Sequence, residues 1–413
     1  MNTITIIKFF FIILIYFSIL FLLDSTYLEN FIWKSEIKFI DFRILISWLE
    51  CNYLGFDVYS LDEIKNCPNF YSIIYYGDLW LLIPYNELLK DFYLNILPYI
   101  VIFLFVSVFV FLTSPTSFLD FSILVLAFLN PSTLLLIERL GFDIFIFLFI
   151  IFISLNRIYF LNWMTIFYLT FIKVYPAILG INIFLENIER SFKKNLILIF
   201  TLISISLVYF YFNIDKYMIS IIKGASNSGK AGYHYLFSLN TLPKISKYIF
   251  EINYIFSLLS IYCLFFILAK FFNNKFRNNI KLFIEEIFSK KGRLFLLGGY
   301  LSLFCFILFS NFVYREILLL LLIPYLVQIK KSSHDIFLYF FISLIFFRFI
   351  FLYLYGFINI NDDINYINGV RFFSDKFLII ITLKGIIDFF LMCFVSIIIY
   401  NGTIKFIKFK KLN

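Results

Sequence analysis

The sequence predicts an all-α fold, a polytopic bundle of about 10 to 12 transmembrane helices with a structured first external loop. Two observations carry this prediction. Hydrophobic residues make up 62% of the chain and its mean hydropathy is +0.94, values that exclude an ordinary soluble domain. Several uninterrupted apolar runs also approach or exceed the roughly 18 to 20 residues that a helix needs to cross a bilayer. We therefore treat residues 1–413 as a single integral-membrane domain.

The first expected span, residues 4–23, resembles a secretory signal in composition but is long and lacks a small-residue cleavage site. It is followed by the polar residues Asp24, Ser25 and Thr26, so we interpret it as a retained anchor. Further spans are expected at residues 94–112, 118–129, 142–154, 195–212, 252–268, 294–310, 317–327, 336–355 and 377–400.

One long apolar stretch, residues 158–185, is interrupted by Lys173-Val174-Tyr175-Pro176. Proline removes a backbone donor and disfavours a straight helix, so the sequence predicts two short helical arms on either side of a break. The outer ends of both arms are then expected to face the same side of the membrane.

Basic residues set the predicted orientation, because short cytoplasmic loops are enriched in Lys and Arg. They cluster around residues 190–194, 270–293, 330–331 and 405–411, which places the amino terminus in the cytoplasm of a plasma (inner) membrane protein. The first external loop is then residues 24–93, and residues 213–251 and 356–376 are also outside. The net charge of +9 reflects this topology, and the scattered cations give no support to nucleic-acid binding.

The five cysteines divide by location. Cys51 and Cys67 share the first external loop, where an oxidising compartment permits a disulfide, and we expect one there in preference to two free thiols. Cys263, Cys305 and Cys393 lie in apolar spans and are expected to be small core residues.

Polar motifs gather at the predicted external boundary. Acids, cations and aromatic residues that meet there suit an amphipathic substrate with its head group outside and its tail in lipid. The motifs are Ile40-Asp41-Phe42-Arg43, Gly55-Phe56-Asp57-Val58-Tyr59, Glu138-Arg139-Leu140-Gly141-Phe142-Asp143, Lys173-Val174-Tyr175-Pro176, Gly232-Tyr233-His234-Tyr235 and Asn311-Phe312-Val313-Tyr314-Arg315-Glu316.

The order of these motifs resembles that of the GT-C superfamily of integral-membrane glycosyltransferases. Within it the chain is most similar to glycosyltransferase family 87, which includes polyprenyl-phosphate-mannose-dependent mannosyltransferases. The resemblance extends from residue 24 to about residue 325. The Lys-x-Tyr-Pro motif matches in full at Lys173, whereas the Glu-Arg-Gly-Asn-x-Asp form appears here as Glu138-Arg139-Leu140-Gly141-Phe142-Asp143, which leaves the subfamily open.

The resemblance implies a GT-C-like architecture and a polyprenyl-phosphate-linked donor of mannose or another hexose or pentose. The acceptor is a glycan or glycolipid at the external face, in cell-envelope glycan biosynthesis. Asp41 is the implied general base of an inverting transfer, since a lipid phosphate leaves as a stable anion and needs charge neutralisation more than protonation. No cofactor is expected and no ligand set supports a metal, although a divalent ion stays open. The implied substrate-binding residues are Lys173, Arg139, Glu138, Asp143, Tyr175, His234 and Arg315, with Lys173 favoured for the phosphate because it lies at a helix break.

Each assignment has an alternative. Asp41 could pair with Arg43 or cap a helix, and Asp24 and Asp57 compete as bases. Glu138 and Arg139 could form a boundary ion pair with Asp143 as partner.

Two further residues also have simpler interpretations. Arg315 with Glu316 could be a topological anchor, and His234 could be a solvated loop residue. At the level of function, the alternative is a transporter or flippase for lipid-linked sugars, for which Arg348, Lys384 and Asp388 are the deeper charges; a nonenzymatic membrane scaffold ranks third.

Overall fold

The computed structural model describes residues 3–25, 37–68, 78–173, 175–187, 192–215, 218, 236–308, 311–332, 336–361, 366–367, 370–371 and 375–412. These residues are almost entirely helical, as the sequence predicted, and they add two pairs of two-residue antiparallel strands. Among them, four helices are long and apolar enough to cross a membrane, or up to six if each of two bent helix pairs is one span. Several helices of this kind are consistent with a multi-pass membrane protein.

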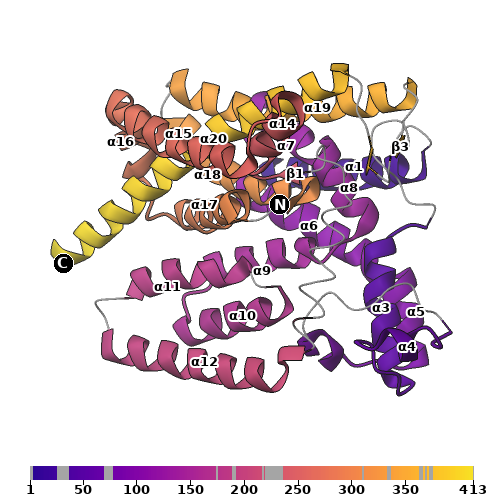
Figure 1. Cartoon of the computed structure of the whole chain (residues 1–413). Coiled ribbons are helices and arrows are strands. Elements are labelled where there is room, and N and C mark those ends of the chain that lie inside the picture. The colour runs from indigo at the N-terminus through magenta and orange to yellow at the C-terminus, as the bar shows by residue number, and fades with distance from the viewer. Residues whose placement is uncertain are drawn as a thin grey trace. The chain divides into compact units, whose positions relative to one another are not determined.

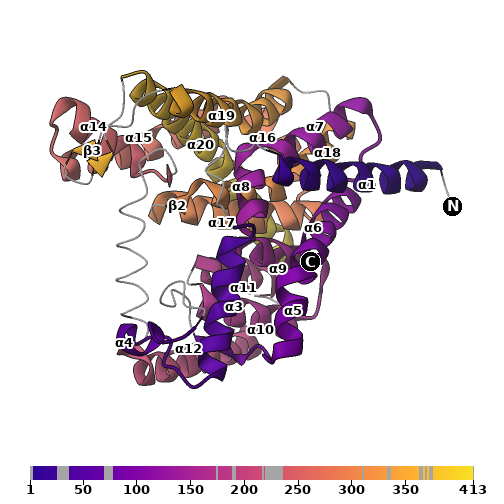
Figure 2. The same cartoon turned by 90° about the vertical axis from the view of Figure 1, so that its right-hand side faces the viewer.

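The chain divides into two compact units. The first unit comprises residues 1–34, 104–138 and 230–405. Its elements include the strand pair β1–β2 and the adjacent helices α19 and α20 (Figure 2). They are α1 (Thr3–Asp24), most of α6 (Leu97–Thr113), α7 (Phe118–Leu129), α8 (Pro131–Arg139), β1 (Leu236–Phe237), α14 (Thr241–Phe250), α15 (Tyr254–Lys275), α16 (Arg277–Glu285), α17 (Lys290–Leu308), β2 (Asn311–Phe312), η4 (Val313–Leu322), α18 (Ile323–Ser332), α19 (Ile336–Asn361), β3 (Tyr366–Ile367), β4 (Val370–Arg371) and α20 (Asp375–Leu412).

The second unit comprises residues 35–103, 139–229 and 406–413. Within it, α9, α10, α11 and α12 lie in sequence beside one another (Figure 1), and α3 lies against α5. Its elements are α3 (Ile40–Tyr53), α4 (Leu61–Ile64), η1 (Asp78–Leu82), α5 (Glu87–Asn95), α9 (Asp143–Leu155), α10 (Tyr159–Ile172), η2 (Tyr175–Ile178), α11 (Leu179–Asn187) and α12 (Phe192–Phe212).

Several segments that the sequence suggested as spans are short helices. Helices α7 and α9 have 12 and 13 residues. At about 1.5 Å per residue they are roughly 18 to 20 Å long, less than the roughly 30 Å of a bilayer core. Hydropathy alone therefore does not fix the span count, because a short buried helix is as apolar as a spanning one.

The predicted break at Lys173 is present. Helix α10 ends at Ile172, Lys173 is extended, and the 3₁₀-helix η2 starts at Tyr175 before α11. Pro176, which cannot donate to a preceding carbonyl, explains why α10 does not continue. The segment predicted as the first external loop, residues 24–93, contains α3, α4, η1 and most of α5, and α5 with α6 is one of the two bent pairs that could be a single span.

The segment expected as a span at residues 317–327 differs from a regular α-helix. Its first part, η4, is a 3₁₀-helix of 10 residues, and α18 follows from Ile323. Runs of 3₁₀-helix longer than three or four residues are uncommon. Pro324 explains only why no single α-helix runs from η4 into α18, because its ring would clash with the carbonyl of Leu320, whereas the first turn of α18 tolerates it.

Helix α17 fixes η4 from one side. A Cβ added to Gly298 would lie 2.5 Å from the Cβ of Leu321, so only glycine permits this approach. The residues of η4 from Ile317 to Leu322 are all fully buried.

Candidate functional site

The site begins at the turn between α8 and α9. Helix α8 ends at Arg139, and Leu140 has a φ of 48°, the left-handed conformation that commonly terminates helices and favours glycine. Asp143 then occupies the first turn of α9, where the positive end of the helix dipole favours a carboxylate. This turn separates Arg139 and Asp143, so they do not share one helix surface.

Asp143 instead binds the Lys173 motif. The ammonium of Lys173 donates to Asp143 Oδ2 at 2.7 Å, and the hydroxyl of Tyr175 donates to Asp143 Oδ1. All three residues are buried, and the side chains of Lys173 and Asp143 are 8% and 1% exposed. The break after α10 thus brings both polar residues of the Lys-x-Tyr-Pro motif, Lys173 and Tyr175, into contact with the carboxylate of Asp143.

Asp41 pairs with Arg139, whose Nη1 lies 3.2 Å from Asp41 Oδ1. Asp41 lies in the first turn of α3, but the N-cap of that helix is Phe39 and has no side-chain capping bond. Arg43 donates from Nε to the carbonyl of Lys38. These contacts favour neither of the simpler interpretations of Asp41, as a helix cap or as a partner of Arg43.

The carboxyl of Asp41 sits in a perturbed environment. Burial raises its pKa above the ordinary value, while the nearby charges of Arg139 and Lys173 and the hydrogen bond from Arg139 act in the opposite direction. Asp143 is also near enough to raise this pKa. Because Arg139, Asp143 and Lys173 all act on the charge of Asp41, we treat the two ion pairs together as one cluster of the second unit, Asp41–Arg139–Asp143–Lys173–Tyr175.

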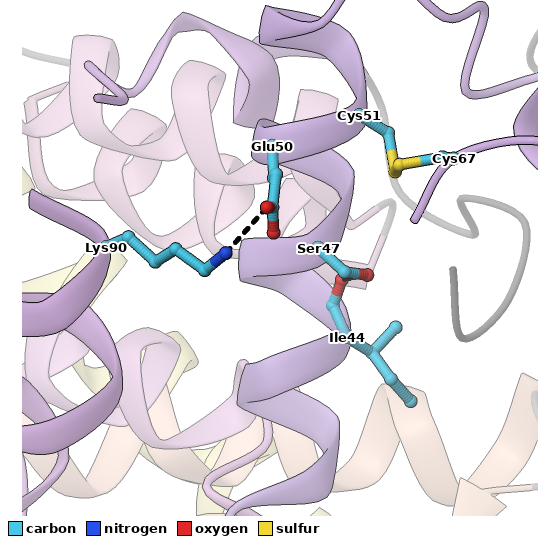
Figure 3. Close-up of a disulfide and its surroundings, with 6 residues drawn as sticks. All are labelled: Ile44, Ser47, Glu50, Cys51, Cys67 and Lys90. Atoms are coloured by element: carbon cyan, nitrogen blue, oxygen red, sulfur yellow. Dashed lines mark hydrogen bonds and ion pairs between the residues drawn. A yellow bond between two sulfur atoms is a disulfide. The ribbon is translucent and has the colours of Figure 1, made fainter. Parts of the chain in front are cut away.

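Helix α3, which carries Asp41, is braced near its other end (Figure 3). Cys51 on α3 forms a disulfide with Cys67. Glu50 forms an ion pair with Lys90 of α5, in which Nζ of the lysine lies 2.6 Å from Oε1 of the glutamate. The indole of Trp80 donates to the carbonyl of Leu45 at 3.1 Å. Three independent contacts therefore hold α3 in place.

The other residues singled out from the sequence lie elsewhere. Glu138 is buried in α8 and Arg315 is half-buried in η4, both in the first unit. His234 lies outside the described residues. Of the competing bases, Asp24 is exposed at the end of α1, and exposed Asp57 accepts the backbone N–H of Tyr59 in a turn.

Sequence reasoning named Asp143 but did not identify its partners. It offered an ion pair with Glu138 and Arg139 or direct substrate contact, whereas the carboxylate of Asp143 accepts from Lys173 and Tyr175. The left-handed turn after Arg139 ends the helix and removes the i,i+4 geometry that would join Arg139 to Asp143, but it lies at Leu140 and no glycine marks that position in the sequence.

Within the described residues, no three or more His, Cys, Asp or Glu side chains are grouped in a way that could hold a metal ion. The cluster itself combines two carboxylates with two cations and a phenol, a set suited to proton transfer and to binding an anion.

Comparison of the chain with models of protein families, with curated proteins and with solved structures found no match.

Proposed function

We propose that the protein is an inverting membrane glycosyltransferase of GT-C type. It transfers mannose or another hexose or pentose from a polyprenyl-phosphate donor to a glycan or glycolipid acceptor. The donor enters from the outer leaflet and the acceptor from the external aqueous side, with the amino terminus in the cytoplasm. The observation that carries the proposal is the contrast between the two acids of the cluster.

Only one of these acids keeps access to a substrate. The side chain of Asp41 is 25% exposed and that of its partner Arg139 is 23% exposed, whereas Asp143 is 1% exposed and accepts from both Lys173 and Tyr175. A general base must reach the proton that it removes. Asp41 is therefore the base, and Asp143 is the counter-ion that positions Lys173.

The charge balance of the cluster fits this chemistry. Asp41 and Asp143 offset Arg139 and Lys173 in the resting state. When the acceptor oxygen attacks the anomeric carbon, its proton passes to Asp41 and the C–O bond to the phosphate breaks, so the phosphate takes the electron pair. Neutral Asp41 leaves the cluster with one net positive charge as the phosphate gains a negative one.

Arg139 and Lys173 can share that stabilisation. Protonation of Asp41 releases much of the hold on the guanidinium of Arg139, a group suited to bidentate phosphate contacts. Lys173 has three N–H donors, and the contact with Asp143 Oδ2 uses one of them. Donors fixed where charge develops are the most effective form of transition-state stabilisation.

The test is transfer of radiolabelled sugar from a panel of polyprenyl-phosphate sugars by purified protein in lipid. Asp41→Asn is expected to abolish turnover. Asp57→Asn is the matched control, because the introduced amide can still accept the N–H of Tyr59 and the position is exposed. Full activity in correctly folded Asp41→Asn would remove Asp41 from the role of base.

The alternative, a transporter or flippase for lipid-linked sugars, drew on the deeper charges Arg348, Lys384 and Asp388. These residues pair with one another and with Glu316, so they offset each other's charge. Donor binding without transfer by the wild-type protein would favour this alternative.

A further inference from the structure

A second charged cluster lies in the first unit and is buried more completely than the first. Glu316 of η4 accepts from Lys384 of α20 at 2.7 Å and from Ser132 of α8 at 3.0 Å, and it forms an ion pair with Arg348 of α19. Asp388 of α20 binds Lys384 at 2.7 Å and Arg348 at 3.1 Å. The four charged side chains are at most 5% exposed.

Two acids and two bases make this network neutral. Ionisable residues among membrane helices are costly and rarely kept without a function. A buried ion pair also adds little stability compared with an apolar packing of the same volume, and its best-attested use is to specify one arrangement over another.

In this protein, the network could specify the conformation of η4, which is a 3₁₀-helix and not an α-helix. Glu316 anchors one part of this segment, and the close approach of Leu321 to Gly298 anchors another. The five steps from Glu316 to Leu321 rise about 10 Å in a 3₁₀-helix and about 7.5 Å in an α-helix. If both anchors hold, the segment cannot contract to the α form.

Arg315 immediately precedes Glu316, so its position depends on the same anchor. The guanidinium of Arg348 also lies 5.2 Å from the ring centroid of Phe237 in β1, and β1 pairs with Asn311 and Phe312, which lead into η4. The network thus contacts both segments that meet at the start of η4.

We propose that Glu316 is a positioning residue for Arg315, because its ion pairs with Arg348 and Lys384 hold η4 in the 3₁₀ form. Released from this anchor, each of the six steps from Leu321 back to Arg315 would shorten by about 0.5 Å, a displacement of about 3 Å. This geometric inference does not depend on transferase activity.

The test uses two neutral double variants that differ in which acid keeps its charge. Glu316→Gln with Lys384→Met removes the anchor on η4 and leaves the Arg348–Asp388 pair. Asp388→Asn with Lys384→Met is the matched control, because it leaves the Glu316–Arg348 pair. Both avoid an uncompensated buried charge, which could prevent folding.

The distance is measured by electron–electron resonance between spin labels at Arg315→Cys and Ser332→Cys, in a Cys263→Ser background because Cys263 is exposed. The Glu316 double variant is expected to shorten this distance by about 3 Å, and the Asp388 double variant to leave it unchanged. No change in the first variant, or an equal change in both, would overturn the proposal.

If wild-type protein transfers no sugar, the transferase proposal fails, and the distance measurement still decides whether Glu316 sets η4.

Discussion

Replacing Lys173 with Met should expose the dependence of the second unit on its buried ion pair. Lys173 and Asp143 are 8% and 1% exposed, and their charged atoms are 2.7 Å apart. Removing one partner of such a pair leaves an uncompensated buried charge, which costs about 3–5 kcal/mol. Tyr175 still donates to Asp143, so we expect a value near the lower end, about 3 kcal/mol.

The free energy of unfolding is measured in lipid–detergent micelles from the fluorescence of the four tryptophans. Lys173→Met with Asp143→Asn should recover most of the lost stability, because the introduced asparagine is neutral and can still accept from Tyr175. Lys281→Met, at an exposed position of α16, controls for the change in side-chain chemistry and should shift stability by less than about 0.5 kcal/mol.

Measurement of sugar transfer separates the role of Lys173 in stability from its proposed role in donor binding. Both the single and the double variant should weaken use of the donor more than use of the acceptor, because both lack the ammonium that we propose binds the donor phosphate. The reasoning is refuted if the double variant is as unstable as the single one. The phosphate role is refuted if acceptor use is the more strongly impaired.

Three other predictions concern the same unit. The acidic limb of kcat/KM should lie above the ordinary range of an Asp carboxyl, because Asp41 must be ionised and its pKa is raised; Arg139→Gln should move the limb to still higher pH, and an unshifted profile would contradict this. Reduction of the Cys51–Cys67 disulfide should lower the free energy of unfolding by about 3 kcal/mol and raise the thiol titre from three to five, whereas an unchanged melting temperature would show that the link adds no stability. Leu140→Gly should relieve about 1–2 kcal/mol of left-handed strain but lose about 2–5 kcal/mol of buried packing, so a net loss is expected in thermal unfolding and a gain would show that strain dominates.

Part of the fold was accessible from the sequence because single residues determine it. Pro176 predicts the break after α10, and the density of apolar residues predicts a helical membrane protein. The 3₁₀ form of η4 was not predicted, because the apolar run at residues 317–327 has the same composition as a spanning helix. Pro324 signals a break before α18, but it does not distinguish a 3₁₀-helix from an α-helix in the residues that precede the break.

The candidate site was accessible only as a list of residues. Asp41, Arg139, Asp143 and Lys173 allow two sets of ion pairs, and spacing favours Arg139 with Asp143 at i,i+4. The left-handed backbone at Leu140 rules that geometry out. The long-range partners, 98 residues apart for Asp41 and Arg139 and 30 for Asp143 and Lys173, cannot be read from one sequence.

The two charged clusters show why residue type alone does not assign chemistry. Each contains two carboxylates and two cations, and each is neutral overall. In the network of Glu316, Arg348, Lys384 and Asp388 the side chains are at most 5% exposed, so a substrate proton cannot reach either acid without a rearrangement of the helices. A group closed in this way can hold an arrangement of helices but cannot exchange protons with a ligand.

The cluster around Asp41 divides the two tasks between its members. Its inner pair, Asp143 with Lys173, is nearly as closed as the network of the first unit, whereas Asp41 and Arg139 each keep about a quarter of the side chain exposed. The raised pKa of Asp41 favours proton uptake at this more open position, and the inner pair keeps a cation near it. Exposure, and not charge count, therefore distinguishes the two clusters, and it is the reason that we propose Asp41, and neither acid of the buried network, as the general base.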